Sequence, residues 1–316
     1  MRIAITGFRG LIGKALAASL RADGHEVVGV SRSPGPIAAA DSAARSGSTT
    51  AATGASSTAG ETVVWDVAAG TIDAAALEGL DAIVHLAGES IGGRWSARKK
   101  AAIMSSRVES TKLLADTIRS LDAKPSVFVS GSAVGFYGNR GEEELTEWSL
   151  PGDGFLAEVC KQWERAAVPI PDAGVRLVRI RTGLVVGPGA EAIERMAKIT
   201  RLGAGGPLGD GRQWWSWISL DDEVRAIRHL IDSDVDGAFN LTGPNPVRQR
   251  DFQRALSAAL RRPSFIPAPQ FAIRAALGEM GQALLLDSTR VLPDALTEDG
   301  FEFADPDLET ALAAAL

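Results

Sequence analysis

Hydrophobic positions near the N-terminus follow a strand pattern and then a helix pattern. Residues 3–5 (IAI) form a short apolar run typical of a buried strand, and Ile12, Leu16 and Leu20 recur at helical spacing. Residues 26–30 (EVVGV) predict a second strand. Because a helix connects the two strands, the pattern indicates a βαβ unit with parallel pairing.

The same alternation continues through residue 241. Helical patterns over residues 101–121 and 155–167 lie between strand patterns, which are expected at 82–86, 126–130, 176–180 and 237–241. This order predicts an α/β fold, a doubly wound parallel sheet of the Rossmann type that occupies residues 1–262. Segments from about residue 186 onward are expected on the substrate side.

Two segments interrupt this alternation. In residues 38–60, 21 of 23 residues are Ala, Ser, Thr or Gly, a composition that predicts a flexible surface insertion without chemistry of its own. From residue 263 to 316, prolines separate short helical pieces such as residues 271–286. We expect a small, mostly helical appendage that packs on the main domain.

Composition excludes several functional classes. With 33 basic and 39 acidic residues the net charge is −6, so general binding to nucleic acid or to anionic membranes is not expected. Cys160 is the single cysteine, which excludes an intramolecular disulfide and a cysteine-based zinc site. The chain starts directly with a strand and has no membrane-length apolar run. We therefore expect a cytoplasmic protein.

A glycine-rich turn follows the first strand. Residues 6–13 read TGFRGLIG, and the turn lies between a predicted strand and a predicted helix, where backbone can approach a pyrophosphate closely. A bare glycine triplet would be weak evidence, but this context is the one that a dinucleotide requires. The predicted cofactor contacts here are Thr6, Gly7, Arg9, Gly10, Leu11, Ile12 and Gly13.

The end of the second strand favours NADP(H) over NAD(H). A carboxylate there would bind the ribose hydroxyls of NAD, whereas this chain has Ser31-Arg32-Ser33, and an arginine suits a 2′-phosphate. Arg9 is a possible second phosphate ligand or a solvated loop arginine. Asp66, after the insertion, is a candidate acceptor for the adenine amino group.

The strand at 82–86 ends in residues that suit the nicotinamide side. Leu86, Ala87 and Gly88 are small enough to let backbone pass beneath the ribose, whereas His85 is expected to be a satisfied strand residue. Arg107 is predicted either to face the cofactor phosphates and the sheet edge or to form a surface salt bridge. Val185 completes the predicted cofactor contacts.

Five motifs in order resemble the extended short-chain dehydrogenase/reductases. They are residues 6–13, 84–88, 130–134 (SGSAV), 181–188 (RTGLVVGP) and 216–222 (SWISLDD). Further segments resemble the nucleoside-diphosphate-sugar epimerase-like branch: residues 86–91 (LAGESI), 94–95, 106–108, 202–214, and the stretch 267–312, which resembles that branch's C-terminal domain of unknown function. The resemblance implies a Rossmann domain with NADP and a smaller substrate-side lobe.

The chain departs from the superfamily's catalytic pattern. The resemblance implies a Tyr-x-x-x-Lys pair with a serine, and Ser132 matches the serine, but Ala157 stands four residues before Lys161. Tyr137, the only tyrosine, lies in a neighbouring turn, where it either replaces the missing phenol or is structural. Alternatively, Glu89 or Glu158 transfers the proton as a carboxylate of raised pKa, or the site binds NADP without turnover.

The substrate side is predicted from a glycine-rich loop and the residues after it. In the family a similar loop and arginine bind the substrate's diphosphate, so Arg212 and Trp214, together with Glu89, are predicted to bind a small-molecule substrate, with a nucleotide sugar as one candidate. Asp221 and Asp222 are expected to begin a helix, and no metal site is predicted. The expected function is NADP-dependent reductase or epimerase-like activity. The alternative is a non-catalytic, redox-responsive NADP(H)-binding protein.

Overall fold

One mostly parallel sheet organises the chain. The computed structural model describes residues 1–33, 62–263 and 265–316. Within these residues, eight strands pair in the order β12-β8-β6-β5-β1-β2-β3-β4, and only the β3–β4 pair is antiparallel. The bounds are β1 Arg2–Thr6, β2 Glu26–Ser31, β3 Thr62–Asp66, β4 Thr71–Ile72, β5 Ala82–His85, β6 Val127–Ala133, β8 Arg176–Thr182 and β12 Gly237–Leu241.

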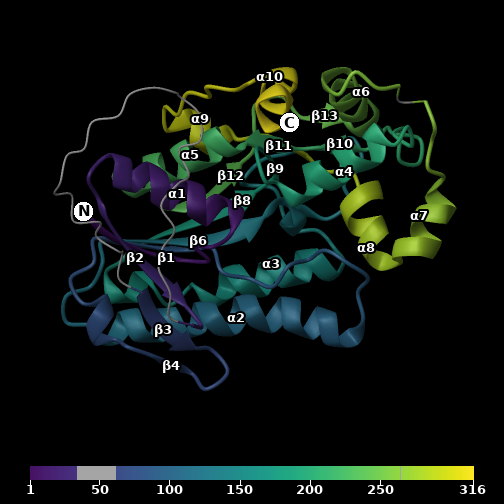
Figure 1. The fold of residues 1–316 in the computed structure, drawn as a ribbon. Coiled ribbons are helices and arrows are strands. Elements are labelled where there is room, and N and C mark those ends of the chain that lie inside the picture. Colours follow the sequence, from purple (N-terminus) through teal and green to yellow (C-terminus); the bar gives the residue numbers. More distant parts are fainter. Residues whose placement is uncertain (34–61, 264) are drawn as a thin grey trace, which may run out of the picture.

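Helices cover both faces of this sheet (Figure 1). On one face α1 (Leu11–Ala22) packs beside α5 (Leu220–Asp232), and on the other α2 (Ala97–Ser120) packs beside α3 (Phe155–Ala166). The apolar side of each helix supplies core residues, such as Leu16 and Ile227 on the first face and Leu114 and Ile118 on the second. The predicted doubly wound Rossmann sheet is confirmed.

Element boundaries differ from the predictions in ways with local causes. The helix predicted from residue 101 begins at Ala97, because Ser96 caps it by accepting from the Lys99 amide at 3.2 Å. For α5 the N-cap is Ser219, whose hydroxyl accepts from the Asp222 amide, so the two aspartates lie inside the first turn. Strand β3 was not predicted, since only Val63 and Trp65 of its five residues are buried.

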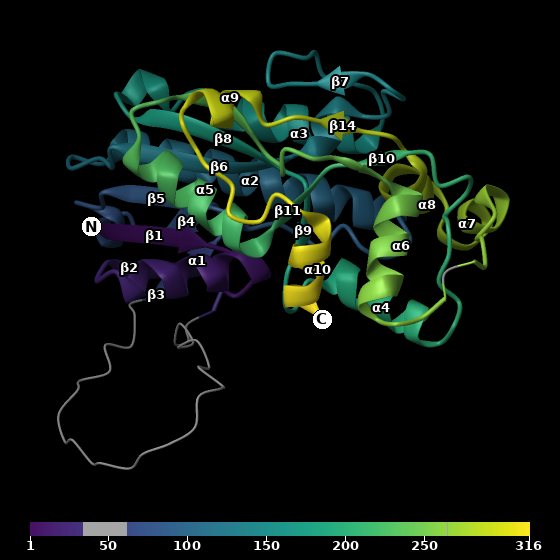
Figure 2. The same ribbon diagram turned by 90° about the horizontal axis from the view of Figure 1, so that it is seen from above.

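A smaller lobe lies beyond the carboxyl ends of the sheet strands, visible beside α4 and α6 in Figures 1 and 2. Its core joins apolar residues of α4 (Glu191–Arg201), α6 (Gln249–Ala259) and α10 (Leu308–Ala315). Three short strand pairs brace it: β9 (Leu184–Val186) with β11 (Trp217–Ser219), β10 (Trp214–Trp215) with β13 (Val247–Arg248), and β7 (Glu144–Leu145) with β14 (Arg290–Val291).

The C-terminal segment is shared between the two parts. The helix expected over residues 271–286 is broken at Gly278, whose φ of +64° separates α7 (Gln270–Leu277) from α8 (Glu279–Gly281), and a π-turn follows over Gln282–Leu286. Leu296 of α9 (Asp294–Glu298) and Phe301 join the core beneath α1 and α5. The last part of the chain therefore contributes to both cores, with Leu296 and Phe301 in the first and Leu308 and Leu312 in that of the lobe.

Two further predictions concern the insertion after β2 and membrane-spanning helices. The insertion predicted at 38–60 lies outside the described residues. Among the residues that are described, no helix is long and apolar enough to cross a membrane.

Candidate functional site

In the glycine turn after β1, Gly7 and Gly13 pack so closely against neighbouring backbone that neither position has room for a side chain. A Cβ added at Gly13 would lie 2.4 Å from the Gly7 carbonyl oxygen, and one at Gly7 would lie 2.8 Å from the Leu86 carbonyl carbon. Thr6 ties the turn to the next strand, because its Oγ1 accepts from the amides of Leu86 (3.1 Å) and Ala87 (3.0 Å). The turn is thus fixed against the end of β5.

The N-terminus of α1 opens directly from this turn. The N-cap is Gly10, which has no side chain with which to accept from the first helical amides, among them those of Leu11 and Ile12. Such amides and the helix dipole together bind phosphate groups. The turn therefore has the donor set and the shape that a dinucleotide pyrophosphate requires.

Two arginines lie at the neighbouring end of β2. Arg9 donates to the Ser33 hydroxyl at 3.2 Å and to the Ser33 carbonyl at 3.3 Å, and its guanidinium lies 5.1 Å from the Phe8 ring centroid. Arg32 is exposed, and the strand ends in Ser31 instead of a carboxylate. The structure thus brings Arg9 and the segment 31–33 together, with positive charge at the place where a ribose would lie.

Asp66 is the exposed last residue of β3. Its Oδ1 accepts from the amides of Ala68 and Ala69, both at 3.0 Å. This carboxylate oxygen already stabilises its own turn, and the predicted contact with adenine stays a prediction.

Arg107 lies over the backbone at the end of β5. Its guanidinium donates to the carbonyls of Glu89 (2.9 Å) and Ile103 (3.2 Å), and a Cβ at Gly88 would come within 3.0 Å of its Cζ. Its Cζ lies 5.1 Å from the centroid of the Trp163 ring. Of the two interpretations of Arg107, the structure has the sheet-edge orientation, and burial lowers the pKa of the guanidinium.

The two candidate acids have ordinary ionised environments, which corrects the prediction of a raised pKa. Lys99 donates to Glu89 at 2.7 Å, and this bond is the main reason that the pKa of Glu89 is lowered, with smaller contributions from Arg32 and Arg107. Glu158 is paired with Gln162 and Lys161, which lower its pKa as well. Neither carboxylate lies in an apolar pocket that would hold it protonated.

A buried polar network surrounds the serine that matches the family pattern. Ser132, 6% exposed, donates to Glu164 Oε1 at 2.7 Å. Arg181 binds both oxygens of the same carboxylate, Nε to Oε1 at 2.8 Å and Nη2 to Oε2 at 3.0 Å. Sequence reasoning missed Glu164 and Arg181, although Glu164 falls on the buried side of a strongly amphipathic helix, where a charge needs a partner.

Tyr137 belongs to the far end of this network. Its hydroxyl donates to Asn240 Oδ1 at 2.7 Å and accepts from Arg181 Nη1 at 2.9 Å, and the side chain is fully buried. Burial raises its pKa to about 12. Both hydrogen bonds of the phenol are thus made inside the protein, and the choice between the two predicted roles of Tyr137 stays a prediction.

His85 is a satisfied strand residue, as predicted. The ring lies between Thr6 Oγ1 (2.7 Å from Nδ1) and Ser110 Oγ (3.0 Å from Nε2). Because it is fully buried, its pKa falls to about 3 and it stays neutral.

The position of the missing phenol is part of a small cavity. Ala157, at the start of α3, lines a space of about 50 Å³ together with Gly135, Asp287 and Thr289. Because no tyrosine stands at position 157, Lys161 has no phenol to contact there. Its ammonium group pairs instead with Glu158 at 2.7 Å. Val185, in β9, packs against the core shared by α1 and α5.

Of the three predicted substrate residues, Arg212 and Trp214 lie on the lobe, whereas Glu89 follows β5 at the sheet edge, where its carbonyl accepts from Arg107. Two guanidiniums lie over the Trp214 ring, with the Cζ of Arg248 4.0 Å and that of Arg290 4.5 Å from the ring centroid. The indole Nε1 of Trp214 donates to Glu142. Arg212 is exposed beside it. The indole is thus already stacked within the protein, which leaves Arg212 as the accessible part of the predicted contact.

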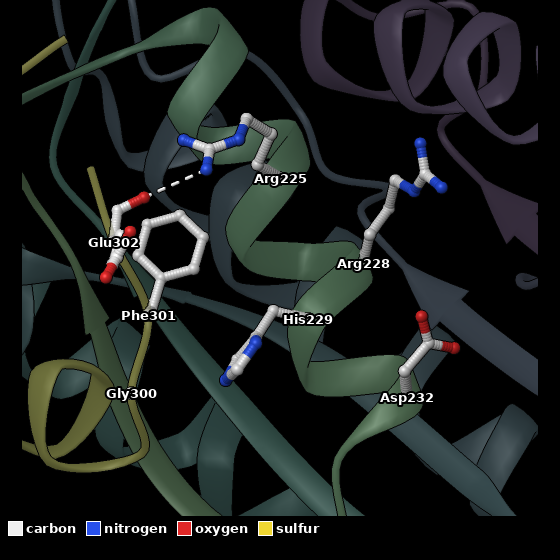
Figure 3. Close-up of a pocket in the computed structure, with 7 residues that line it drawn as sticks. All are labelled: Arg225, Arg228, His229, Asp232, Gly300, Phe301 and Glu302. Atoms are coloured by element: carbon white, nitrogen blue, oxygen red, sulfur yellow. Dashed lines mark hydrogen bonds between the residues drawn. The ribbon is translucent and has the colours of Figure 1, made fainter. Parts of the chain in front are cut away.

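A second cavity, of about 460 Å³, lies on the outer side of α5. Figure 3 shows its lining, in which Arg225, Phe301 and Glu302 meet beside His229. Each of its basic side chains lies beside a carboxylate, Arg225 beside Asp222, Arg228 beside Asp23 and His229 beside Asp299. It shares no lining residue with the cofactor positions predicted at the sheet edge.

Comparison with known proteins fits this geometry. Residues 3–242 match the NAD dependent epimerase/dehydratase family, and residues 268–315 match a domain of unknown function, DUF1731. "Epimerase family protein ML0860" of Mycobacterium leprae is 37% identical over 313 residues, which cover 98% of this chain and 94% of that protein.

Solved structures share the fold along the whole chain. The human epimerase family protein SDR39U1 (isoform 2), crystallised with NADPH, has a TM-score of 0.84 and 32% identity, and the match covers 99% of this chain and 98% of that one. MoeE5 in complex with UDP-glucuronic acid and NAD has a TM-score of 0.77 at 21% identity, with 100% and 97% covered, and so shows the fold alone.

The family match covers most of the chain, and it confirms the resemblance seen in the five motifs. Together with the glycine turn and the parallel sheet, it leads to one assignment. The chain belongs to the NAD dependent epimerase/dehydratase family.

Proposed function

We propose that this protein is an atypical extended short-chain dehydrogenase/reductase, which binds NADP(H) at the carboxyl edge of its sheet and uses it as a cofactor. The proposed substrate is a small hydroxyl or carbonyl compound, with a nucleotide sugar as one candidate. The human relative with NADPH supports the choice of cofactor, and the fold shared with MoeE5 is compatible with a nucleotide sugar.

The basic residues around the end of β2, Arg9 from the glycine turn and Arg32 from the strand end, are the observation that carries the proposal. Arg9 contacts Ser33 through two bonds, Arg32 is exposed in the same segment, and Ser31 stands where NAD specificity would call for a carboxylate. A 2′-phosphate beside two guanidiniums would form charge-assisted bonds, which are stronger than neutral ones.

The remaining predicted contacts fit a cofactor laid across the sheet edge. The amides after Gly10 would bind the pyrophosphate, and the backbone of residues 86–88 would lie beneath the nicotinamide ribose. Arg107 would add positive charge there, with Val185 at the lobe side. When bound, the nicotinamide would supply hydride chemistry, while the protein supplies position and electrostatics.

One observation favours a second function, a non-catalytic NADP(H)-binding protein. Position 157 is alanine, Tyr137 is buried, and Lys161 is paired with Glu158, so the usual proton-transfer pair has no counterpart among these residues. Consumption of NADPH with a panel of aldehydes and ketones, and of NADP⁺ with a panel of alcohols and nucleotide sugars, separates the two. Turnover supports the enzyme, and binding without turnover supports the alternative.

The cofactor proposal is tested by calorimetry of NADPH and NADH with wild-type protein and Arg32→Asp. Loss of a charge-assisted contact, about 1.5–3 kcal/mol, should weaken NADPH binding roughly 10- to 150-fold without a matching loss of NADH affinity. Arg119→Asp, the same change at the far end of α2, is the control. Equal NADPH affinity in wild type and Arg32→Asp would refute the assignment.

A further inference from the structure

Charge is unevenly distributed along this chain. Residues 195–212 and 250–274 contain nine basic and two acidic residues, so together they carry +7 in a chain whose net charge is −6. The overall charge therefore gives no guide to this part of the molecule. A strongly basic region in an acidic chain indicates an anionic partner.

The two basic segments meet at one end of the lobe. The Ile266 amide donates to the Gly205 carbonyl at 3.4 Å, and Gln253 Nε2 of α6 donates to Thr200 Oγ1 of α4 at 3.0 Å. In both views α4, α6 and α7 lie together on the side of the molecule away from the N-terminus (Figures 1 and 2). Residues far apart in the sequence thus form one surface, which we call the lobe end.

Large apolar side chains are exposed on the lobe end. Five of the eleven exposed large apolar residues in the described part of the chain belong to it: Ile199 (51% exposed), Leu202 (78%), Phe265 (74%), Ile266 (51%) and Phe271 (76%). Contiguous exposed apolar side chains of this size mark a surface that binds a protein or a membrane.

Unpaired positive charge accompanies these apolar side chains. Lys198 and Arg201 lie in the last turn of α4, and Arg261 and Arg262 follow the end of α6, all four exposed. Within the described residues none of the four has a carboxylate partner, so their charge is available to an anionic ligand.

The backbone at Arg261 supports a role for its side chain. Arg261 closes α6, where its amide donates to the Ala258 carbonyl at 3.0 Å and the next amide, of Arg262, donates to the Ser257 carbonyl at 2.9 Å. Its φ is +52°, the only positive value at a non-glycine position in the described residues. Glycine is favoured at such a helix end, so an arginine here keeps its charge at the expense of local stability.

We propose that the lobe end binds the surface of anionic lipid bilayers, with its apolar side chains in the interface and its basic side chains on the lipid headgroups. A bilayer offers negative headgroups above an apolar layer, so one surface satisfies both sets of side chains. An acidic protein would need a matching apolar pocket beside its carboxylates, and a second copy of the lobe end would bring like charges together. The inference is independent of the proposed cofactor and reaction.

Flotation of the full chain with lipid vesicles tests this proposal. Wild type should float with vesicles of phosphatidylcholine that contain about one-third phosphatidylserine, and should bind vesicles of phosphatidylcholine alone roughly 100-fold more weakly. Raising the salt to about 1 M should weaken binding to the anionic vesicles, because it screens the charges.

Removal of two charges tests the basic residues. Each basic group near an anionic surface strengthens binding about fivefold, so Arg261→Gly/Arg262→Gln should lower the affinity for the anionic vesicles roughly 30-fold. Glycine relieves the strained backbone at position 261, so this variant should fold. Lys112→Gln/Arg119→Gln, which removes the same charge from exposed positions on α2, is the matched control and should bind like wild type.

A single substitution tests the apolar contact. Leu202→Ser should lower the affinity for the anionic vesicles roughly tenfold, the low end of what the burial of one leucine contributes. Leu150→Ser is the matched control, because Leu150 is 76% exposed and lies after β7, outside the lobe end. It should leave vesicle binding unchanged.

Three results would overturn the inference: no flotation of wild type with the anionic vesicles, an affinity that is unchanged in Arg261→Gly/Arg262→Gln, or one that is unchanged in Leu202→Ser. Binding of wild type to polyglutamate as tight as to the vesicles would point to an acidic protein instead. Thermal melting shows whether each variant is folded. If Arg261→Gly/Arg262→Gln is not, Lys198→Gln/Arg201→Gln carries the same expected loss, since both side chains are exposed.

Discussion

Glu223 is a carboxyl group buried in the core, and its substitution gives a prediction with a calculable size. It is fully buried in the first turn of α5, where Thr182 donates to its Oε1 at 2.8 Å. Within the described residues its Oε2 has no hydrogen-bond partner. Burial raises the pKa of Glu223 to about 8, so the folded protein holds it neutral at pH 7.

The sign of the pH dependence follows from the two states. In the unfolded chain the group ionises near its ordinary value of 4.5, whereas in the folded protein it ionises at about 8. The folded state therefore binds one more proton between these values, and stability is lost as the pH rises through them. The loss is about 1.4 kcal/mol per pH unit, or roughly 4 kcal/mol between pH 5 and 9.

Glu223→Gln removes the titration and keeps the shape. We expect the free energy of unfolding of wild type, minus that of the variant, to fall by that amount from pH 5 to pH 9. The measurement is urea unfolding at each pH, followed by tryptophan fluorescence. Any pH-independent effect of the glutamine amide on stability shifts this difference equally at every pH and so does not change its dependence on pH. Asp221→Asn, an exposed carboxylate in the same turn, should give a flat difference. A difference for Glu223→Gln that stays constant within about 0.5 kcal/mol would refute the reasoning.

Three further predictions concern the site. Tyr137→Phe should lower the free energy of unfolding by about 1–3 kcal/mol, because it leaves Asn240 and Arg181 short of a hydrogen-bond partner. The NADPH affinity measured by calorimetry should stay the same. A large loss of affinity with full stability would contradict a structural role. Gly13→Ala should weaken NADPH binding more than Gly10→Ala, because the Cβ added at Gly13 would lie 2.4 Å from the Gly7 carbonyl oxygen and the one at Gly10 would lie 3.2 Å from it. Equal NADPH affinities of the two variants would show that the turn is not the binding element. Lys99→Met should raise the pKa of Glu89, measured by ¹³C NMR of labelled glutamate carboxyls, because the lysine bond is the main cause of its lowered value, and an unchanged titration would count against this pair.

Long, regular elements could be predicted from the sequence, and short ones could not. The helix of residues 155–166 and the strands at 82–85 and 237–241 have clear periodicity, so their predicted ranges agree within about a residue. The two- and three-residue strands of the lobe carry too few alternating positions. Strand β3 does alternate, with Val63 and Trp65 buried, but it follows directly on the Ala-, Ser-, Thr- and Gly-rich stretch of the sequence. Their pairing is decided by the packing of segments far apart in sequence, such as β14 against β7.

The site divides in the same way. The glycine turn depends on local backbone geometry, which the residue types reveal, and so the positions of Gly7 and Gly13 could be read directly. The Ser132–Glu164–Arg181 network joins β6, α3 and β8, so its partners are far apart in the sequence and no local pattern predicts which side chains meet. For Glu89, the sequence could not show that Lys99 would lie within 2.7 Å and keep its pKa low.

The central claim, that a 2′-phosphate lies beside Arg9 and Arg32, is tested most directly by phosphorus NMR of NADP⁺ bound to the protein. A free phosphate monoester of this kind takes up its proton with a pKa of about 6. Two guanidiniums beside it favour the dianion, so we predict that the bound 2′-phosphate resonance keeps its dianionic shift to below pH 5 in wild type and titrates at higher pH in Arg32→Asp. A bound resonance that titrates like free NADP⁺ in wild type would contradict the account.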